Sequence, residues 1–337
     1  MKPMTSAEAR QAFLDFFEEM GHKKVASSSL VPGNDPTLLF TNAGMVQFKD
    51  VFLGLDKRPY SRATTSQKCM RVAGKHNDLE EVGPSPRHHT FFEMLGNFSF
   101  GDYFVRRDPL RLHAADRGLR LATDRLAFTV YQNDDEAYDI WVEDIGVDPR
   151  RVARMGPKTN FWQMAETGPC GPTSEIHWDK TPELGIDSII PLMQQEDDRF
   201  LELWNLVFMQ YNRAGRPDSH RAVRYAAART RCRHRYGSWS AHPERSQQRQ
   251  SNYETDLFMP IIEATQKLTG ATDAERDANI ILSDCRPRAR SGVPDRRRCC
   301  PARRARCSVC RLVIRRAARF GASSASLSRS SARSPTQ

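Results

Sequence analysis

Two stretches of the sequence combine basic, aromatic and small polar residues in patterns that suit chemistry on a phosphate. The first stretch consists of Gln67 to Val72, a polar loop that contains Lys75 and His88, and a second segment from Thr90 to Phe100. A guanidinium such as that of Arg71, held in place by a strand, can neutralise negative charge on a phosphorus atom. The alternative interpretation is a structural hairpin with a solvated basic loop.

The second stretch, Asn160 to Ile176, is rich in Gly and Pro and contains Trp162 and Glu175. Trp162 suits the wall of a small pocket, and Glu175 suits a magnesium ion or a hydroxyl group. Further along, Asn205 and Val207 share one face if their aromatic segment is a strand, because side chains alternate with a period of two. Each assignment has a structural alternative, since tryptophan is usually well buried and Val207 would suit any buried strand.

The hydrophobic pattern predicts the elements that must position these residues. Ser6 to Phe17 has apolar residues at three- and four-residue spacing behind a serine cap, which predicts an amphipathic helix. Ser27 to Phe40 alternates around two prolines, which predicts short strands and a turn. The other predicted elements are strands over Ala63–Val72, Thr90–Phe100, Arg125–Tyr131 and Phe200–Tyr211, and a helix over Asp134–Ile145. Their irregular order predicts an antiparallel α+β fold.

The net charge of +10 conceals a contrast between two parts of the chain. Residues 1–212 contain 24 Lys and Arg against 31 Asp and Glu, a net charge of −7, whereas the remaining residues contain 27 against 10, a net charge of +17. Only one of those 27 basic residues, Lys267, is a lysine, and six of the eight cysteines also lie in the second part. The composition therefore divides the chain near residue 212.

The hairpin, with Arg71 before its loop and His88-His89-Thr90-Phe91-Phe92 after it, resembles motif 2 of the class II aminoacyl-tRNA synthetases in its alanyl-tRNA synthetase form. Asn160–Ile176 resembles the alanine-pocket loop of that family, and Ser27–Gly54 resembles its motif 1 region. The resemblance implies an α+β fold, in which an antiparallel sheet core is flanked by helices and followed by part of a helical domain.

The resemblance also implies a role for each candidate residue. Arg71 is implied as the catalytic residue and a ligand of ATP, and Phe92 as the ring that stacks on adenine. ATP contacts are further implied for Lys75, His88 and Glu175, and alanine contacts for Trp162, Asn205 and Val207. Mg²⁺ is implied to accompany ATP. Zinc is not expected in this chain, because the family's zinc belongs to its editing domain.

The resemblance breaks off after Asn212, where the family continues into motif 3, a strand whose aspartate receives the substrate amine. An arginine-rich stretch replaces it up to Gln250. Read one base later, codons for Arg233–Ser240 can encode Val-Ile-Asp-Thr-Gly-His-Gly-Leu, which restores motif 3. The same shift over Asp284–Pro301 gives a sequence like the family's helical domain. Frame shifts thus explain the arginine runs, and they make the zinc-like cysteine spacing at residues 299–310 an accident.

These matches predict three segments. Residues 1–250 form a class II aminoacylation domain in which 213–250 are out of frame and motif 3 is lost. Residues 251–321 begin a helical domain that binds the tRNA acceptor stem, with about 284–309 out of frame. Residues 322–337 are predicted to be an out-of-frame, disordered tail. Loss of motif 3 predicts a hole in the sheet, an unneutralised substrate ammonium and little or no adenylate formation.

The activity that the resemblance implies is ATP-dependent activation of alanine and its transfer to the acceptor stem of tRNA(Ala). The expected partners are therefore tRNA(Ala), alanine and ATP. No apolar run reaches membrane-spanning length, so we expect a cytoplasmic protein without a membrane partner. The alternative is a noncatalytic RNA-binding or regulatory paralogue with a basic tail. A free-standing editing protein would need editing motifs, which this sequence lacks.

Overall fold

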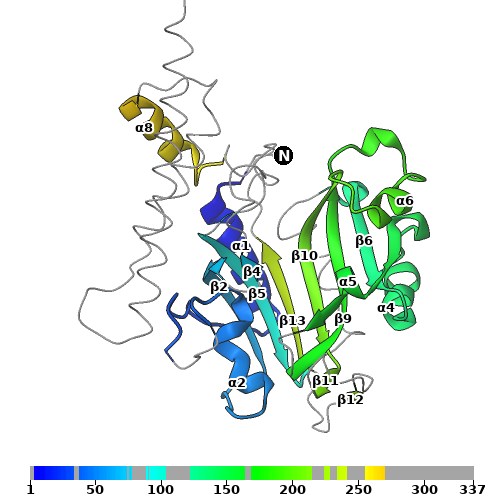
Figure 1. Ribbon diagram of the computed structural model, residues 1–337, viewed down its shortest axis with the longest axis horizontal. Helices are drawn as coiled ribbons and strands as arrows, with labels where there is room; N and C mark the ends of the chain where they lie inside the picture. The colour runs from blue at the N-terminus through cyan, green and yellow to red at the C-terminus, as the bar shows by residue number, and fades with distance from the viewer. Residues whose placement is uncertain are drawn as a thin grey trace, which may run out of the picture.

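The computed structural model describes residues 4–33, 38–73, 76–77, 89, 91–103, 122–163, 168–214, 224–227, 234–240 and 255–269. One large mixed sheet with short helices around it dominates this part of the chain (Figure 1). The predicted α+β fold is confirmed. None of the described helices is both long enough and apolar enough to span a bilayer.

The large sheet has the strand order β1-β2-β5-β13-β10-β9-β11-β12, with β6 and β8 also paired to β9, and β7 paired to β6. Its central pairs, from β2 through β9, are all antiparallel. The strands are β1 (Lys23–Lys24), β2 (Arg62–Met70), β5 (Phe91–Phe100), β6 (Leu126–Tyr131), β7 (Val152–Met155), β8 (Phe161–Gln163), β9 (Gly168–Asp179), β10 (Phe200–Met209), β11 (Tyr211–Ala214), β12 (Arg224–Ala227) and β13 (His234–Ser240). Two further short strands, β3 (Val72–Ala73) and β4 (His76–Asn77), pair with each other.

Short helices border this sheet. The α-helices are α1 (Ser6–Glu19), α2 (Lys49–Phe52), α4 (Asp135–Asp139), α5 (Pro157–Asn160), α6 (Ile189–Gln194) and α8 (Met259–Thr269). The 3₁₀ segments are η1 (Gly44–Phe48), η4 (Thr123–Arg125), η6 (Pro149–Arg151) and η7 (Pro182–Leu184), and η5 (Ile140–Asp144) is a π-helical turn that continues α4. The predicted helix over Asp134–Ile145 and the predicted strands at β2, β5, β6 and β10 are thereby confirmed.

Helix α1 begins one residue earlier than the sequence pattern indicated. The serine predicted as the cap, Ser6, is the first helical residue, and Thr5 is the N-cap. Thr5 and Glu8 form a capping box, because each side chain accepts a hydrogen bond from the other residue's backbone N–H. Ser6 instead donates through its backbone N–H and its hydroxyl to the carboxylate of Asp256, the former at 3.0 Å.

The segment from Ser27 to Phe40 does not form the predicted strands in its described residues, 27–33 and 38–40. The side chain of Gln67 takes the place of a strand ladder there. Its Oε1 accepts from the Ser28 backbone N–H at 2.9 Å, and its Nε2 donates to the Ser28 carbonyl at 3.2 Å. The prediction failed because a side chain on β2 satisfies backbone groups that the pattern assigned to a neighbouring strand.

The two faces of the sheet carry different apolar clusters. On one face, α1 contributes Phe13 and Phe17, whose rings contact the fully buried Trp204. The other face packs Phe98 and Val207 against η1 and α2. Trp204 and Val207 are three residues apart on β10, so their side chains point to opposite faces of the sheet. Strand β10 therefore separates two cores, which explains why it is aromatic and nearly uncharged.

The predicted hole in the sheet is wrong. Strand β13 lies between β5 and β10 and pairs with both, so that Gly237 is opposite Asn97 on one side and Leu206 on the other. The hydrogen bonds of a sheet join backbone N–H and C=O groups, so they do not require a particular sequence. Strands β5 and β10 each present such groups to the position that lies between them. Residues 234–240, which we predicted to be out of frame, therefore supply the backbone of this central strand, although their sequence differs from that of motif 3.

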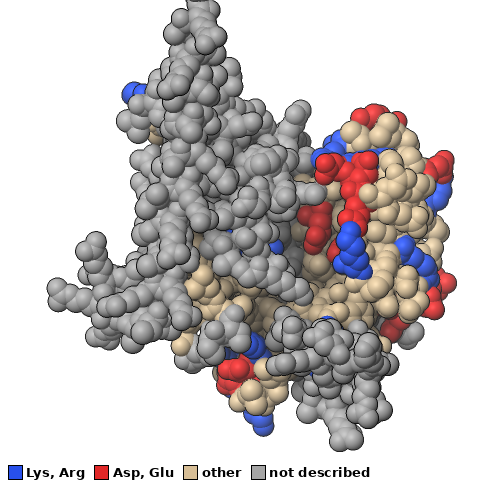
Figure 2. Space-filling view, in the orientation of Figure 1, with Lys and Arg blue, Asp and Glu red and all other residues tan. Residues whose placement is uncertain are grey.

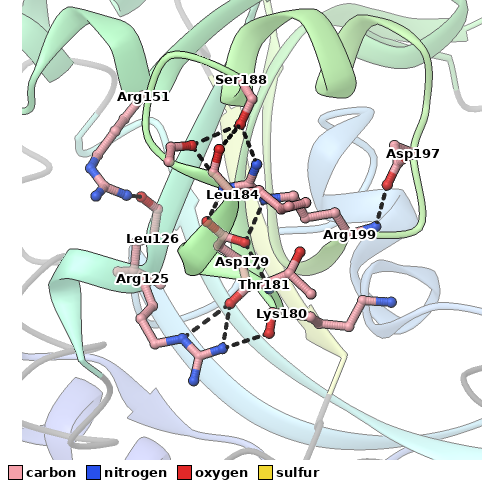
Figure 3. Close-up of polar contacts among 11 residues, drawn as sticks. Arg125, Leu126, Arg151, Asp179, Lys180, Thr181, Leu184, Ser188, Asp197 and Arg199 are labelled. Carbon is pink, nitrogen blue, oxygen red and sulfur yellow. Dashed lines mark hydrogen bonds and ion pairs between the residues drawn. The ribbon is translucent and has the colours of Figure 1, made fainter.

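A buried ion pair fixes the loop between β9 and β10 (Figure 3). Arg199 donates through Nε and Nη2 to the two carboxylate oxygens of Asp179, at 2.7 and 2.8 Å, and each side chain is 2% exposed. Arg199 also donates to the Ser188 hydroxyl and to the Gly185 carbonyl. Arg125 donates to the Asp179 carbonyl from the start of β6. The network ties three segments to the end of β9.

Of the predicted helical domain, the described residues are 255–269, and they contact the start of α1 and His89. Asp256 accepts the two hydrogen bonds from Ser6, and the ring of Phe258 stacks on His89 at 4.9 Å between centroids. The segments 284–309 and 322–337, which we predicted to be out of frame, lie outside the described residues. The predicted domain boundaries therefore stay a prediction.

Candidate functional site

Arg71 and Phe92 meet at the end of the β2–β5 hairpin where its loop connects the two strands. The Arg71 guanidinium carbon lies 5.1 Å from the centre of the Phe92 ring, a cation–π distance, and Arg71 Nε donates to the Asn42 carbonyl at 3.1 Å. The side chains of Arg71 and Phe92 are both partly buried. The structure thus holds a guanidinium and an aromatic ring side by side, while Lys75 and His88 lie outside the described residues.

Trp162 and Val207 belong to one apolar cluster, on the face of the sheet opposite α1. Val207 is 1% exposed, and the partly buried Trp162 packs against its cluster from β8. Trp162 is opposite Gly171 on β9, and a Cβ placed on Gly171 would lie 1.8 Å from the Phe208 carbonyl oxygen. The glycine therefore lets β9 approach β10 closely, which positions the indole beside Val207.

Glu175 lies opposite Asn205 across the β9–β10 pair and is only 8% exposed. Its Oε1 is 3.4 Å from Asn205 Nδ2, and its Oε2 accepts from the Thr129 hydroxyl at 3.1 Å. His177 Nε2 is also 3.1 Å from Oε2. Three hydrogen-bond partners therefore surround this carboxylate, and no lysine or arginine of the described residues bonds to it.

All of these side chains belong to one face of the sheet. Residues opposite each other in an antiparallel pair point to the same side, and so do residues two apart on a strand. Asn205 and Val207 share a face by that rule, and Glu175 joins them as the partner of Asn205. Phe98 packs with Val207, and Phe92 is six residues before it on β5. The face opposite α1 therefore carries both groups of candidate residues.

A comparison of the chain with known proteins identifies its family. The family described as tRNA synthetases class II (A) matches residues 8–330. The chain belongs to this family. It is 49% identical to the alanine–tRNA ligases of Nitrosomonas europaea, Nitrosospira multiformis and Nitrosomonas eutropha, over 323, 325 and 324 residues. Each alignment covers 94% of this chain and 36% of the relative, so the chain spans about a third of their length.

Membership of the class II synthetases confirms the family that the hairpin motif indicated. The roles given to single residues stay predictions, although the structure places six of the eight on one sheet face, in two groups that lie on either side of β13. These six are Arg71, Phe92, Trp162, Glu175, Asn205 and Val207.

Sequence reasoning missed the polar groups that support Glu175 in this synthetase. Thr129 and His177 bond to its Oε2, and Asn160, which is fully buried, donates to the Thr129 hydroxyl at 2.8 Å. Glu175 and His177 are two apart, a spacing that would have revealed a shared strand face. The glycines and prolines of the preceding residues hid that strand, because such residues usually interrupt one.

The described residues contain no group of three or more His, Cys, Asp and Glu side chains placed to hold a metal ion. Their two cysteines, Cys69 and Cys170, are buried, and burial raises the pKa of the Cys69 thiol to about 12 and raises that of Cys170. Neutral thiols are poor metal ligands. Glu175 remains the residue whose chemistry fits magnesium, because that ion commonly takes one or two carboxylates and completes its shell with phosphates and water.

Proposed function

We propose that this chain is the aminoacylation region of an alanine–tRNA ligase, which activates alanine with ATP and transfers it to tRNA(Ala). The observation that carries this proposal is the shared sheet face, which carries the Arg71–Phe92 pair on the β2–β5 side of β13 and the group formed by Trp162, Glu175 and Val207 on the β10–β9 side. The 49% identity to alanine–tRNA ligases supports alanine as the substrate. We also propose a cytoplasmic location, which translation factors of this kind require.

The hairpin would bind ATP. Phe92 stacks on adenine, and the Arg71 guanidinium contacts the α-phosphate, where charge increases as the alanine carboxylate attacks. Arg71 is prepared for that role, because its Nε is already fixed by the Asn42 carbonyl. Lys75 and His88 contact phosphate oxygens. Mg²⁺ supplies charge neutralisation for the phosphates, and Glu175 is the residue that would hold it.

The β8–β10 group would bind alanine. Trp162 and Val207, which pack in one apolar cluster, would form the wall that accepts a methyl side chain and excludes larger ones. Asn205 offers an amide to the polar end of the substrate. Contacts of this kind discriminate one methylene by about 1–3 kcal/mol, so the pocket alone gives modest selectivity.

Adenylate formation by the chain as printed should nevertheless be slow. Strand β13 occupies the place of motif 3, yet the sequence His234–Ser240 contains no Asp or Glu to receive the substrate ammonium. An ammonium left without its carboxylate is costly in a site from which water is excluded. We therefore expect the chain to bind ATP and alanine but to activate alanine poorly.

Isothermal titration of the purified chain with ATP, and separately with alanine, tests this proposal. We expect saturable binding of both, with a loss of ATP affinity of at least tenfold in Arg71→Ala. Arg58→Ala is the matched control, because Arg58 pairs with Asp56 at the surface and is outside the proposed site. A chain that binds neither ligand, or an Arg71→Ala variant that binds ATP unchanged, would overturn the proposal.

The charge contrast favours a second candidate, a noncatalytic RNA-binding paralogue. The 27 basic against 10 acidic residues after Asn212 would attract phosphates without sequence preference. On the visible lobe with α4 and α6, by contrast, acidic and basic side chains are interspersed (Figure 2). An uninterrupted gene with no motif 3 hidden one base away would favour the paralogue, and resequencing decides between the two.

A further inference from the structure

Glu175 is a buried carboxylate that no lysine or arginine contacts in the described part of the chain. Its hydrogen-bond partners there are the Thr129 hydroxyl, the Asn205 amide and the His177 ring. A buried charge is expensive, and proteins usually pair it with a cation. A carboxylate held by these groups without a lysine or an arginine therefore indicates that a positive charge arrives from outside the protein.

Asn205 strengthens that indication. Its Nδ2 is used by Glu175, so its Oδ1 faces away from the carboxylate, and this oxygen is buried without a hydrogen-bond partner. The reverse orientation of the amide would place two acceptors against each other. The Glu175 carboxylate and Asn205 Oδ1 are acceptor groups on adjacent strands. Together they can accept hydrogen bonds from a ligand or bind a cation.

His177 holds the carboxylate from the same strand. Its Nε2 must carry the proton in the bond to Glu175, because an ionised carboxylate can only accept. Its Nδ1 is buried and has no hydrogen-bond partner among the described residues. His177 therefore holds the carboxylate through Nε2.

We propose that His177 is a positioning residue, which fixes Glu175 so that this carboxylate receives a cationic group of the ligand. This inference rests on the proposed function and assigns a role to a residue that the family resemblance did not single out. The cation is either the ammonium of alanine or the magnesium ion that accompanies ATP. The shared chemistry is a positive charge brought to the Glu175–Asn205 pair.

The geometry explains why His177 acts on the ligand through Glu175. Thr129 and His177 contact the same oxygen, Oε2, from two strands, while Asn205 contacts Oε1. A carboxylate has about four acceptor positions, so at least one remains open for the ligand. Removing His177 leaves Oε2 with a single support and frees the carboxylate to rotate away from the substrate face.

The experiment compares His177→Phe with His177→Gln by isothermal titration of the full chain. The phenyl ring keeps the volume but donates no hydrogen bond, whereas the glutamine amide can donate to Oε2. We expect His177→Phe to lose tenfold or more in affinity for one probe, and His177→Gln to recover most of that loss. Alanine without magnesium and ATP with magnesium are titrated separately, and the probe that loses affinity identifies the cation.

A melting curve for each variant separates this role from loss of stability. His22→Phe serves as the matched control, because His22 is also buried but bonds to the Phe17 carbonyl and to Tyr103 on the other face of the sheet. That variant should lose stability and keep both affinities. Nitrogen-15 resonances of His177 should show a protonated Nε2 in the wild type, because that atom faces the carboxylate.

The outcomes distinguish this inference from the proposed function. A wild-type chain that binds neither probe overturns both. A wild type that binds both probes, together with a His177→Phe variant of equal affinity, overturns the role of His177 alone. An unprotonated Nε2 in the wild type would also contradict it, because His177 would then donate no hydrogen bond to Glu175.

Discussion

The two faces of the large sheet use their buried residues differently. The face toward α1 is filled by rings and aliphatic chains, with Phe13, Phe17 and Trp204 in mutual contact. The opposite face carries the buried Glu175 carboxylate, to which Thr129, His177 and Asn205 are hydrogen-bonded. A buried carboxylate is costly to a fold unless its charge is compensated. The first face therefore maintains the structure, and we propose that the second receives a ligand.

Replacing Trp204 by alanine should cause the largest change, because Trp204 is fully buried at the centre of the α1 face. Loss of the indole and the cavity left behind should lower the free energy of unfolding by about 4 kcal/mol. Chemical denaturation measures this. Leu184→Ala is the control, since Leu184 is 59% exposed, and it should change stability little. Equal effects of the two variants would refute the division between the faces.

Breaking the Arg199–Asp179 pair should have the next largest effect on stability. Arg199→Met leaves the Asp179 carboxylate buried without its bidentate partner, and we expect a loss of about 3 kcal/mol in unfolding free energy. Lys158→Met provides the comparison, because the Lys158–Glu196 pair is solvent-exposed and contributes little. Affinity for ATP should remain within a factor of two, and a larger loss would tie this network to the site.

His22 should make stability depend on acid. Burial lowers the pKa of His22 to about 4, while its unfolded value is near 6.5, so the unfolded chain binds a proton first as the pH falls. Stability from this residue is complete above pH 6.5 and declines toward pH 4, by about 3 kcal/mol in total. Urea denaturation between pH 7.5 and 4 measures the decline. His22→Phe should flatten it, and an unchanged slope would argue against this assignment.

Asn205→Ala should have the smallest effect on stability. Its Nδ2 makes one long hydrogen bond of 3.4 Å and its Oδ1 makes none, so we expect a change of about 1 kcal/mol or less. Alanine affinity should instead fall about tenfold by titration, because the substrate loses an amide contact. Large destabilisation with unchanged affinity would mean that Asn205 belongs to the structural face after all.

Much of the scaffold could be predicted from the sequence, because strands β2, β5, β6 and β10 and helix α1 follow regular apolar patterns. The segment after Ser27 could not, since Gln67 supplies its hydrogen bonds from a distant strand. Strand β13 could not either, because pairing with β5 and β10 places a segment that has no periodicity of its own.

The site could be predicted only in part, and for a similar reason. Motifs identified Arg71 and Glu175 by their neighbours in the sequence, but Thr129 and Asn160 contribute through contacts 46 and 31 residues away, respectively. Such contacts depend on the register of β6 against β9, which no local pattern specifies. The missed residues are therefore those that hold the site rather than those that define its motifs.

Alanine-dependent ATP–pyrophosphate exchange tests the central claim most directly, when the chain as printed is compared with one whose residues 233–240 are restored to Val-Ile-Asp-Thr-Gly-His-Gly-Leu. Both sequences fill the place of β13, but only the restored one supplies a carboxylate for the substrate ammonium. We predict exchange at or near background for the printed chain and a gain of at least a hundredfold on restoration. Rapid exchange by the printed chain, equal to that of the restored one, would contradict the account.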